Sequence, residues 1–339
     1  MHIEENVLLS TVTTFRTGGP ARFLLSLDSA NEVAEAHAFA EVHALPLIPL
    51  GGGSNMLAPD SGVDAVFVRL RANEITKTES ADTFTYTADA GASWDALSAR
   101  AAEDGAWGIE NLSAIPGTVG AAAVQNIGAY GAAFSDVVER VNAYDTKTKR
   151  LVTLAPEECR FGYRTSIFKE ERDRYIITRV ALALSKTPQP NLSYKDVAKR
   201  FANAPTPTLS EVRDAIIAIR TAKFPPLATY GTAGSFFLNP TVSEGDVPAL
   251  RARYPEVPLF DLPEGGVKVP LAWFLDRVLS VKGMREGKAF LWDAQPLVVA
   301  AEEGARAEDV RALAEKVIAL VEEKTGITVT PEVRLLPAH

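Results

Sequence analysis

The sequence predicts an α+β protein of two to three domains, and three observations lead to this fold class. The chain has 339 residues, more than one average domain of about 100–200 residues. Apolar residues make up 47% and charged residues 23%, so the chain can bury large cores and is not disordered as a whole. Strand-like and helix-like hydrophobic patterns are mixed in every region.

Residues 1–70 form the first predicted subdomain, a small α/β unit. Ser29 or Asn31 can cap a helix that runs to about Val42, because their side-chain oxygens accept hydrogen bonds from the free amides of a first helical turn. Apolar runs predict strands at residues 22–27, 47–50 and 65–68.

Residues 71–226 form the second predicted subdomain. Ser93 can cap a helix over 94–103, and a helix that begins at Ser210 must end near Ala222 because Pro225 and Pro226 cannot continue it. A loop rich in polar and aromatic side chains is expected at 160–169. Strands are expected at residues 84–87, 137–144 and 175–184.

Residues 227–326 form the third predicted domain, and residues 327–339 a C-terminal strand that returns to the active site. An amphipathic helix is expected over 269–279, with Pro270 in its first turn. A longer helix is expected over 309–323, with Gly326 as its stop. The strand itself is expected over 327–336.

Charge and cysteine content exclude several classes of function. The chain has 35 Lys and Arg against 43 Asp and Glu, a net charge of −8, which disfavours nucleic acid and anionic membranes as partners. Cys159 is the single cysteine, so neither an internal disulfide nor a thiolate metal site is expected, and none of the four histidines has metal-ligand spacing. The sequence shows no signal peptide and no long apolar run, which favours a cytoplasmic protein without membrane insertion.

Two glycine-rich stretches carry the first indication of a ligand. Residues 51–55 follow an apolar strand, so their amides can approach a diphosphate without interfering Cβ atoms. Residues 115–131 have small side chains at nearly every position, which suits a flat ring or a pyrophosphate lying against main chain. Neither stretch is a Rossmann or P-loop fingerprint, and a flexible turn after a strand is the alternative for the first.

The ordered set of motifs resembles the UDP-N-acetylenolpyruvylglucosamine reductases, also called UDP-N-acetylmuramate dehydrogenases. Matching segments occur in the family's order and span almost the whole chain. They are residues 14–19 (TFRTGG), 51–55 (GGGSN), 117–131, 161–166 (FGYRTS), 233–240 (AGSFFLNP) and 331–334 (PEVR).

This resemblance implies a fold, two cofactors and a reaction. The fold is that of the vanillyl-alcohol-oxidase type, with two α+β subdomains that sandwich FAD and a C-terminal α+β domain that binds the substrate. NADPH is the implied hydride donor, and the reaction reduces the enolpyruvyl ether of a UDP-sugar to a lactyl ether in peptidoglycan precursor synthesis. Hydride goes from flavin N5 to the distal carbon, and the resulting enolate needs a cation and a proton source.

The resemblance also assigns the catalytic roles. Arg164 matches the arginine that stabilises the enolate, since its planar guanidinium can grip a carboxylate. Glu332 matches the acid that works with it, and Ser235 matches the proton donor. An arbitrary arginine, strand glutamate or turn serine usually has a structural role, so it is the motif context that favours function here.

Further residues are assigned to ligand binding in the same way. The FAD is expected to be noncovalent and held by Gly51, Gly52, Gly53, Ser54, Asn55, Gly117, Thr118, Gly120, Ala121, Gln125, Asn126, Gly128 and Tyr130. The sugar nucleotide is expected to contact Tyr130, Tyr163, Tyr194, Lys223, Asn239 and Gln295. Tyr194 indicates the longer subclass, in which a tyrosine-bearing loop closes over bound substrate.

The sequence departs from the family pattern at two positions, and two alternative functions stay open. Leu238 and Thr330 stand where the family commonly has a basic and an acidic residue, which bears on affinity rather than on reaction type. The alternatives are another FAD oxidoreductase of the same fold, and a sugar-nucleotide-binding protein without turnover. A monomer is expected.

Overall fold

The computed structural model describes residues 1–203, 206–262 and 265–337, and the chain folds into two compact units. The first unit comprises residues 1–7, 21–53 and 64–222, and the second comprises residues 8–20, 54–63 and 223–339. Two short N-terminal segments therefore belong to the same unit as the C-terminal third. The boundaries expected at residues 70, 226 and 326 stay predictions.

The first sheet carries most of the N-terminal strands. Its order is β1-β2-β5-β3, and β3 runs parallel to β5 with Leu47 opposite Val66. Helix α1 covers a core formed with strand residues such as Phe23 and Leu25. The strands expected here are confirmed; the bounds are β1 His2–Leu8, β2 Pro20–Leu27, α1 Val33–Val42, β3 Leu47–Pro49 and β5 Val63–Leu70.

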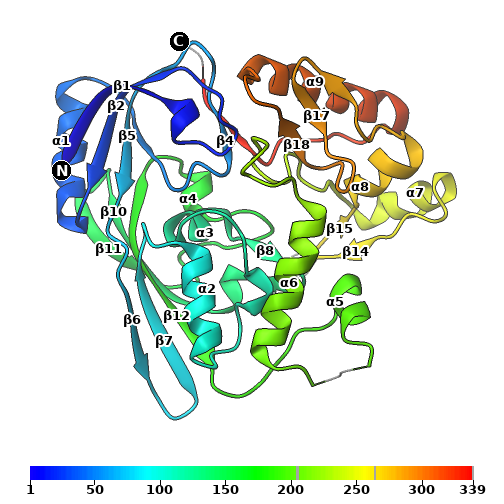
Figure 1. The fold of residues 1–339 in the computed structure, drawn as a ribbon, viewed down its shortest axis with the longest axis horizontal. Coiled ribbons are helices and arrows are strands. Elements are labelled where there is room, and N and C mark those ends of the chain that lie inside the picture. The colour runs from blue at the N-terminus through cyan, green and yellow to red at the C-terminus, as the bar shows by residue number, and fades with distance from the viewer. Residues whose placement is uncertain (204–205, 263–264, 338–339) are drawn as a thin grey trace. The chain divides into compact units, whose positions relative to one another are not determined.

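The second sheet has five antiparallel strands in the order β11-β10-β12-β7-β6 (Figure 1). Helices α2 and α3 pack on it around the buried indole of Trp94. Ser93 caps α2 as expected, accepting a hydrogen bond from the Ala96 amide. The bounds are β6 Ile75–Glu79, β7 Thr83–Asp89, α2 Trp94–Glu103, α3 Val119–Gln125, β10 Val138–Asp145, β11 Arg150–Leu154 and β12 Tyr175–Ser185.

Short elements complete the first unit. The loop expected at 160–169 ends in one helical turn that buries Ile167 and Phe168 against the sheet core. Helices α5 and α6 pack against a small cluster centred on Trp107 and Tyr130. The bounds are β8 Gly128–Ala129, β9 Ala132–Ala133, α4 Ile167–Glu170, α5 Lys195–Arg200 and α6 Leu209–Lys223, whose last residue falls in the second unit.

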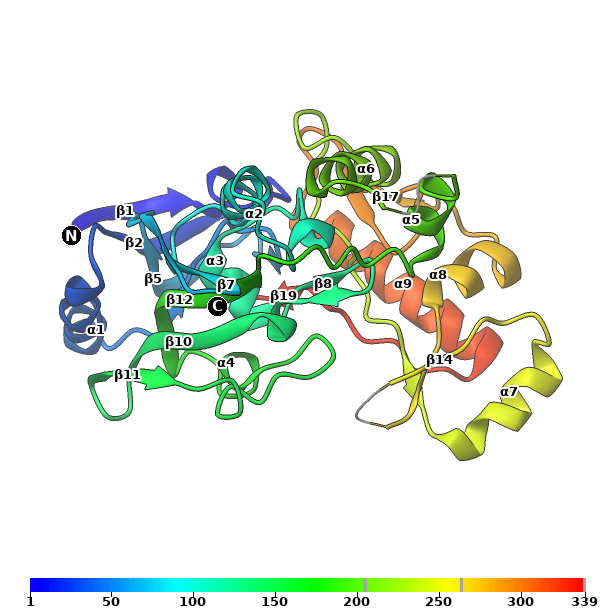
Figure 2. The same ribbon diagram turned by 90° about the horizontal axis from the view of Figure 1, so that it is seen from below.

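In the second unit, α9 lies along the sheet β16-β17-β18, as both ribbon views show (Figures 1 and 2). Val310, Leu313 and Val317 are fully buried on one helix face, and Gly326 ends the helix in a left-handed conformation, both as expected. The bounds are β4 Met56–Leu57, β13 Thr241–Val242, α7 Val247–Arg253, β14 Phe260–Asp261, β15 Val267–Lys268, β16 Arg285–Glu286, β17 Ala289–Leu291, β18 Val299–Ala301 and α9 Ala307–Thr325.

Two expectations for the second unit were wrong in detail. The helix expected over 269–279 begins at α8 Leu271–Trp273 and continues as a wider π-helical stretch over Phe274–Val278, which lets the adjacent Phe274 and Leu275 both be buried. The strand expected over 327–336 is only β19 Arg334–Leu335, parallel to β4. Before β19 the segment pairs instead with Phe236 and Leu238, through the Glu332 amide and the Thr330 carbonyl, and residues 338–339 lie outside the described residues.

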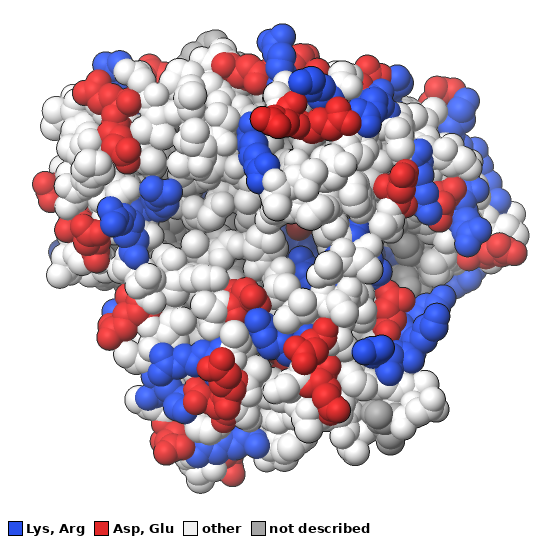
Figure 3. Space-filling view, viewed as in Figure 1, with Lys and Arg blue, Asp and Glu red and all other residues white. Residues whose placement is uncertain are grey.

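The surface carries both signs of charge. On the face drawn in Figure 3, basic and acidic side chains are interspersed. The net charge of −8 is therefore not gathered into one acidic field on this face. No helix within the described part of the chain is both long enough and apolar enough to cross a bilayer.

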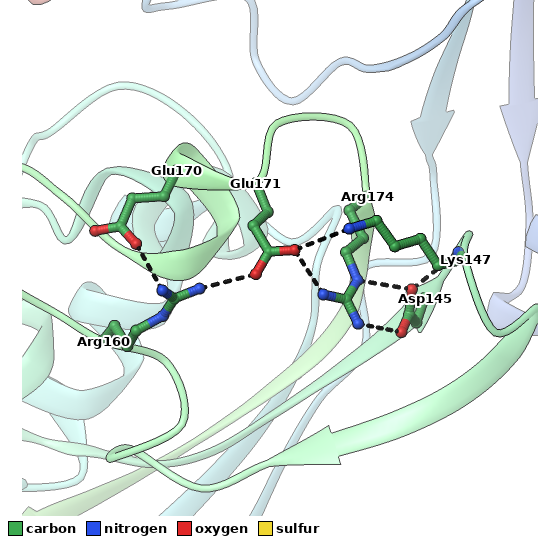
Figure 4. Close-up of polar contacts among 6 residues, drawn as sticks. All are labelled: Asp145, Lys147, Arg160, Glu170, Glu171 and Arg174. Atoms are coloured by element: carbon green, nitrogen blue, oxygen red, sulfur yellow. Dashed lines mark hydrogen bonds and ion pairs between the residues drawn. The ribbon is translucent and has the colours of Figure 1, made fainter.

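A chain of ion pairs fastens the 160–174 segment to the end of β10 (Figure 4). Arg174 donates from Nε to Asp145 Oδ1 at 3.0 Å and from Nη2 to Asp145 Oδ2 at 2.9 Å, and its Nη1 donates to Glu171 at 2.5 Å. Glu171 in turn accepts from Arg160 at 2.8 Å. The hydrogen bonds from Arg174 lower the pKa of the buried Asp145 carboxyl to about 2.

Asp145→Asn should destabilise the protein in a pH-dependent way. Because the folded-state pKa of Asp145 is below its unfolded value of about 3.9, its contribution is complete above about pH 5 and is lost as the pH falls towards 2. The expected loss is about 2 kcal/mol at pH 7, or about 3–6 °C in the thermal unfolding midpoint. Asp82→Asn, at an exposed position, is the control. A difference from wild type that does not shrink between pH 5 and pH 3 would contradict this account.

Candidate functional site

The two glycine-rich stretches lie against each other in the first unit. A Cβ atom on Gly51 would lie 2.9 Å from Ala121 Cβ and 3.0 Å from Thr118 Oγ1. A Cβ atom on Gly52 would lie 3.0 Å from Gly117 Cα. These distances are shorter than ordinary van der Waals contacts, so glycine is required for the loops to meet.

Part of the second stretch, residues 119–125, is the helix α3. Thr118 caps α3, its hydroxyl accepting from the Ala121 amide at 3.4 Å. A Cβ atom on Gly120 would lie 2.8 Å from Ala90 Cβ, so this glycine lets α3 pack closely. Several of the small side chains therefore serve packing, which the sequence did not predict. The buried members are Val119, Gly120, Ala122 and Ala123.

Arg164 lies on a loop that is fastened to the C-terminal end of α3. Its φ is +55°, a left-handed value that costs an arginine about 1 kcal/mol or more. Lys169 Nζ donates to the Arg164 carbonyl at 2.9 Å, and Arg164 Nη2 donates to the Gly128 carbonyl at 2.5 Å. Nearby, Asn126 Nδ2 donates to the Gly162 carbonyl at 2.9 Å. These contacts fix the loop despite the strained backbone.

Ser235 and Glu332 lie on neighbouring segments of the second unit. The Glu332 amide donates to the Phe236 carbonyl at 2.7 Å, so the glutamate pairs with the residue directly after Ser235. The Phe236 amide donates to Leu297 at 2.7 Å on its other side, and Ser235 forms an isolated bridge with Val298. Ser235 and Glu332 are both half-buried.

The end of the first glycine-rich loop contacts the same segment. Asn55 Nδ2 donates to the Glu332 carbonyl at 3.3 Å, and the Arg334 amide donates to the Asn55 carbonyl at 3.1 Å. Ser54 and Asn55 belong to the second unit, whereas Gly51 to Gly53 belong to the first. The predicted cofactor loop therefore crosses the boundary between the units.

Three predicted substrate residues lie elsewhere in the second unit. Asn239 Oδ1 accepts from the Leu271 amide at 3.0 Å, so it caps the helical segment that begins there. Gln295 is in a tight turn, where its carbonyl accepts from the Val298 amide at 2.9 Å. Val298 is also the residue that forms the isolated bridge with Ser235. Lys223 is the last residue of α6.

The tyrosines predicted for the substrate lie in the first unit, two of them in contact. The rings of Tyr130 and Tyr194 pack edge to face at a centroid distance of 5.1 Å. Tyr163 lies under the Arg164 guanidinium, whose carbon is 5.5 Å from the ring centroid. Arg164 and these tyrosines thus share one unit, while Ser235 and Glu332 share the other. That the two groups meet stays a prediction.

Arg220 is a residue that the sequence analysis missed. Its Nε donates to the Ala114 carbonyl at 3.1 Å, and it also hydrogen-bonds to Tyr130. Burial lowers its pKa, although the nearby Tyr130 opposes that shift. A half-buried cation beside a predicted site tyrosine is a candidate ligand contact, and its only sequence signal is a position three residues before Lys223.

Metal and thiol chemistry find no support in this part of the molecule. Among the residues that the structure describes, no group of three or more His, Cys, Asp or Glu side chains could hold a metal ion. Cys159 is fully buried, and burial raises the pKa of its thiol to about 12. The thiol is therefore protonated at neutral pH and is a poor nucleophile.

The N-terminal half of the chain belongs to a known class of cofactor-binding domains. Residues 21–154 match the family described as "FAD binding domain", a range that includes the paired loops at Gly51–Gly52 and Gly117–Ala121. The chain is a flavoprotein with the α+β FAD-binding fold of the vanillyl-alcohol-oxidase type. Residues 225–336 match "UDP-N-acetylenolpyruvoylglucosamine reductase, C-terminal domain".

Full-length relatives identify the family. Proteins named UDP-N-acetylenolpyruvoylglucosamine reductase from Pseudomonas aeruginosa and Cupriavidus pinatubonensis are 37% and 38% identical, covering 99% and 94% of this chain and 99% and 95% of their own. A crystal structure of the reductase from Thermus caldophilus superposes with a TM-score of 0.71 at 25% identity, covering 99% of this chain and 100% of that one. This chain belongs to the UDP-N-acetylenolpyruvoylglucosamine reductase family.

The paired glycine loops fit the FAD that this family uses. Two stretches of main chain that meet through glycines and small side chains can present amide donors to a pyrophosphate. Of the thirteen residues predicted for the cofactor, those at 51–53 and 117–130 lie in the first unit. Their individual contacts with FAD stay predictions.

Gly52→Val should weaken FAD binding while the fold persists. The new Cβ would lie 3.0 Å from Gly117 Cα, and the added methyl groups would force the two loops apart. Overpacking of about 1–3 kcal/mol corresponds to a rise of about 5- to 150-fold in the FAD dissociation constant. Reconstitution of the apoprotein with FAD, followed by flavin absorbance, measures this constant.

Gly245→Val is the matched control, because the nearest atom to its Cβ would be Ser243 Oγ at 3.6 Å. The control should bind FAD as the wild type does, and both variants should retain the wild-type circular dichroism spectrum. Equal FAD affinity in the two variants would show that the loop contact does not shape the cofactor site.

Proposed function

We propose that this protein reduces UDP-N-acetylglucosamine enolpyruvate to UDP-N-acetylmuramate at the expense of NADPH, a step of peptidoglycan precursor synthesis. One main-chain hydrogen bond supports the assignment to specific residues. The Glu332 amide donates to the Phe236 carbonyl at 2.7 Å, so the candidate acid lies on the segment next to the candidate proton donor Ser235. The family match over both parts of the chain supports the reaction type.

FAD, when bound, would supply the redox chemistry, which is hydride transfer from NADPH to the enolpyruvyl double bond. The residues proposed to hold it are the glycines and their neighbours in the two paired loops. Noncovalent attachment is proposed because Cys159 and the histidines lie outside both loops. Denaturation should then release all flavin into solution.

Arg164 is proposed to bind the substrate carboxylate and stabilise the charge that develops on it. When a hydride adds to the distal carbon, the electron pair of the double bond moves towards the carboxylate and forms an enolate. A guanidinium can donate two parallel hydrogen bonds to such a group. The hydrogen bonds from Lys169 and to Gly128 support this role, because they restrict the arginine to one place.

Ser235 is proposed to donate the proton that completes the reaction at the carbon next to the carboxylate. The balance is one hydride on the distal carbon and one proton on the adjacent carbon, which leaves a saturated lactyl ether. A serine hydroxyl is a weak acid, so this step needs nearby groups that favour the alkoxide or resupply the proton. Glu332, on the adjacent segment, is the group proposed for that task.

The remaining predicted residues are proposed to bind the sugar nucleotide. Lys223 can pair with the diphosphate as a point charge, while Asn239 and Gln295 can hydrogen-bond near it. Tyr130, Tyr163 and Tyr194 supply aromatic surface and hydroxyl groups. Asn239 Oδ1 accepts from the Leu271 amide, which fixes the place of this side chain.

Location and assembly are also proposals. A bacterial cytoplasm is supported by the bacterial relatives and by a single, buried cysteine. A monomer without nucleic-acid partners is supported by the acidic net charge and by the mixed surface charges in Figure 3.

Ser235→Ala should separate the two half-reactions. NADPH reduces the flavin before the enolpyruvyl group takes part, so flavin bleaching should remain near wild type. Product formation by the reduced enzyme should slow by about 10²–10⁴-fold, which is the usual contribution of general acid catalysis. Stopped-flow absorbance of the flavin measures both steps.

Ser243→Ala is the matched control, because the Ser243 hydroxyl donates to Asp246 at the surface, at 2.6 Å. This control should leave both half-reactions unchanged. If Ser235→Ala slowed the two half-reactions equally, or left turnover near normal, Ser235 would be a structural residue rather than the proton donor.

A further inference from the structure

Two asparagine side chains fasten the tyrosine-bearing segment, residues 191–200, to the turn at Tyr130. Asn111 Nδ2 donates to the Tyr130 carbonyl at 2.8 Å and to the Asn191 carbonyl at 2.9 Å. Asn191 Nδ2 donates to the Gly131 carbonyl at 2.8 Å. Three hydrogen bonds from two amide groups thus join residues that are 19, 80 and 60 positions apart in the sequence. All of these residues belong to the first unit.

The orientation of Asn111 is fixed by its partners. Only 1% of its surface is exposed, and both groups that face its amide nitrogen are carbonyls, which can only accept. Its Oδ1 is buried without a hydrogen-bond partner among the described residues, which costs about 1–3 kcal/mol. A core position filled for packing alone would favour an apolar side chain, so the two donated hydrogen bonds explain the asparagine.

Asn191 also shapes the start of the segment. Its Oδ1 accepts from the Ser193 amide at 3.2 Å and from the Ser193 hydroxyl at 2.7 Å, which forms a local turn. This turn delivers Tyr194 as the residue before α5. Gly131 is needed opposite it, since its φ is +87° and a Cβ there would lie 2.9 Å from Asn191 Nδ2.

The Asn111 side chain also holds Tyr130, whose backbone is strained. Tyr130 has a φ of +50°, a left-handed value that is costly for an aromatic residue, and its carbonyl is one acceptor for Asn111. The Tyr194 ring packs edge to face on the Tyr130 ring. Val197, the first buried residue of α5, joins the same cluster with Trp107. The positions of the two tyrosines therefore depend on one set of amide contacts.

We propose that the side chains of Asn111 and Asn191 form an amide latch that anchors the start of the Tyr194 segment beside Tyr130, so that the loop closes over the substrate from a fixed base. Both asparagines are positioning residues, because they act on the UDP-sugar through the tyrosines. The proposal rests on the proposed function, in which both tyrosines contact that ligand. A loop that closes from a fixed base loses less conformational freedom on binding, so the latch lowers the substrate KM rather than raising kcat.

The test compares Asn191→Ala, Asn111→Asp and the double variant as FAD-loaded enzymes. Without ligand, hydrogen exchange of amides in residues 191–200 should become about tenfold faster or more, while amides of β7 and β12 keep the wild-type rate. The KM for the UDP-sugar should rise about five- to tenfold, with kcat within about twofold of wild type. Because either change releases the same segment, the double variant should be little worse than the more affected single variant.

Asn203→Ala is the control, since Asn203 is an exposed asparagine shortly after this segment. Asn191→Ala removes a side chain at a partly exposed position, so the test does not depend on the folding of the buried Asn111 variant. Wild-type exchange rates in Asn191→Ala, or fully multiplicative effects on KM in the double variant, would overturn the latch. Absence of turnover in the wild type would contradict the proposed function, and the exchange rates would still decide whether the latch exists.

Discussion

Gly52 approaches Gly117 so closely that one added carbon would lie 3.0 Å from the Gly117 Cα atom. The rest of the candidate site depends on this approach. The first loop continues through Asn55 to the Glu332 segment, and the second continues through α3 to the loop that carries Arg164. Within the first unit, this contact between main chains thus places the first loop against the start of α3, whose other end holds the loop of Arg164. It also leaves amide-rich backbone free of side chains where FAD is proposed to bind.

Two residues of the first unit that are proposed to be functional have strained backbone. Arg164 and Tyr130 both have left-handed φ values, and each has its carbonyl held by a neighbouring amide or ammonium group, from Lys169 for the arginine and from Asn111 for the tyrosine. Such conformations persist only where the surroundings determine them. A guanidinium that must meet a developing carboxylate charge gains from this restriction, because little reorganisation is left for the reaction itself. The ion pairs from Asp145 to Arg160 extend the same support to the outer end of the Arg164 loop.

Much of the fold could be predicted because local signals agreed with tertiary structure. Ser93 caps α2, and the stripe Val310, Leu313 and Val317 is the buried face of α9. Local signals were insufficient where tertiary contacts decide. The sequence did not show that the small residues at 119–125 form a helix that fits against Ala90, and the strand expected over 327–336 was wrong because only Arg334 and Leu335 pair with β4. The candidate catalytic residues Arg164, Ser235 and Glu332 were predicted from the order of the motifs, because their residue types alone do not single them out. Arg220, Asn111 and Asn191 were missed because their significance lies in contacts between segments distant in sequence.

The most direct test of the account is a single turnover without oxygen. The enzyme is bleached with one equivalent of NADPH and then mixed with UDP-N-acetylglucosamine enolpyruvate. The account predicts that the yellow colour returns and that one UDP-N-acetylmuramate forms per FAD. A flavin that stays reduced with this substrate and regains its colour only when oxygen is admitted would contradict the account and indicate an oxidase. A protein that binds the UDP-sugar but never carries a reducible flavin would contradict it as well.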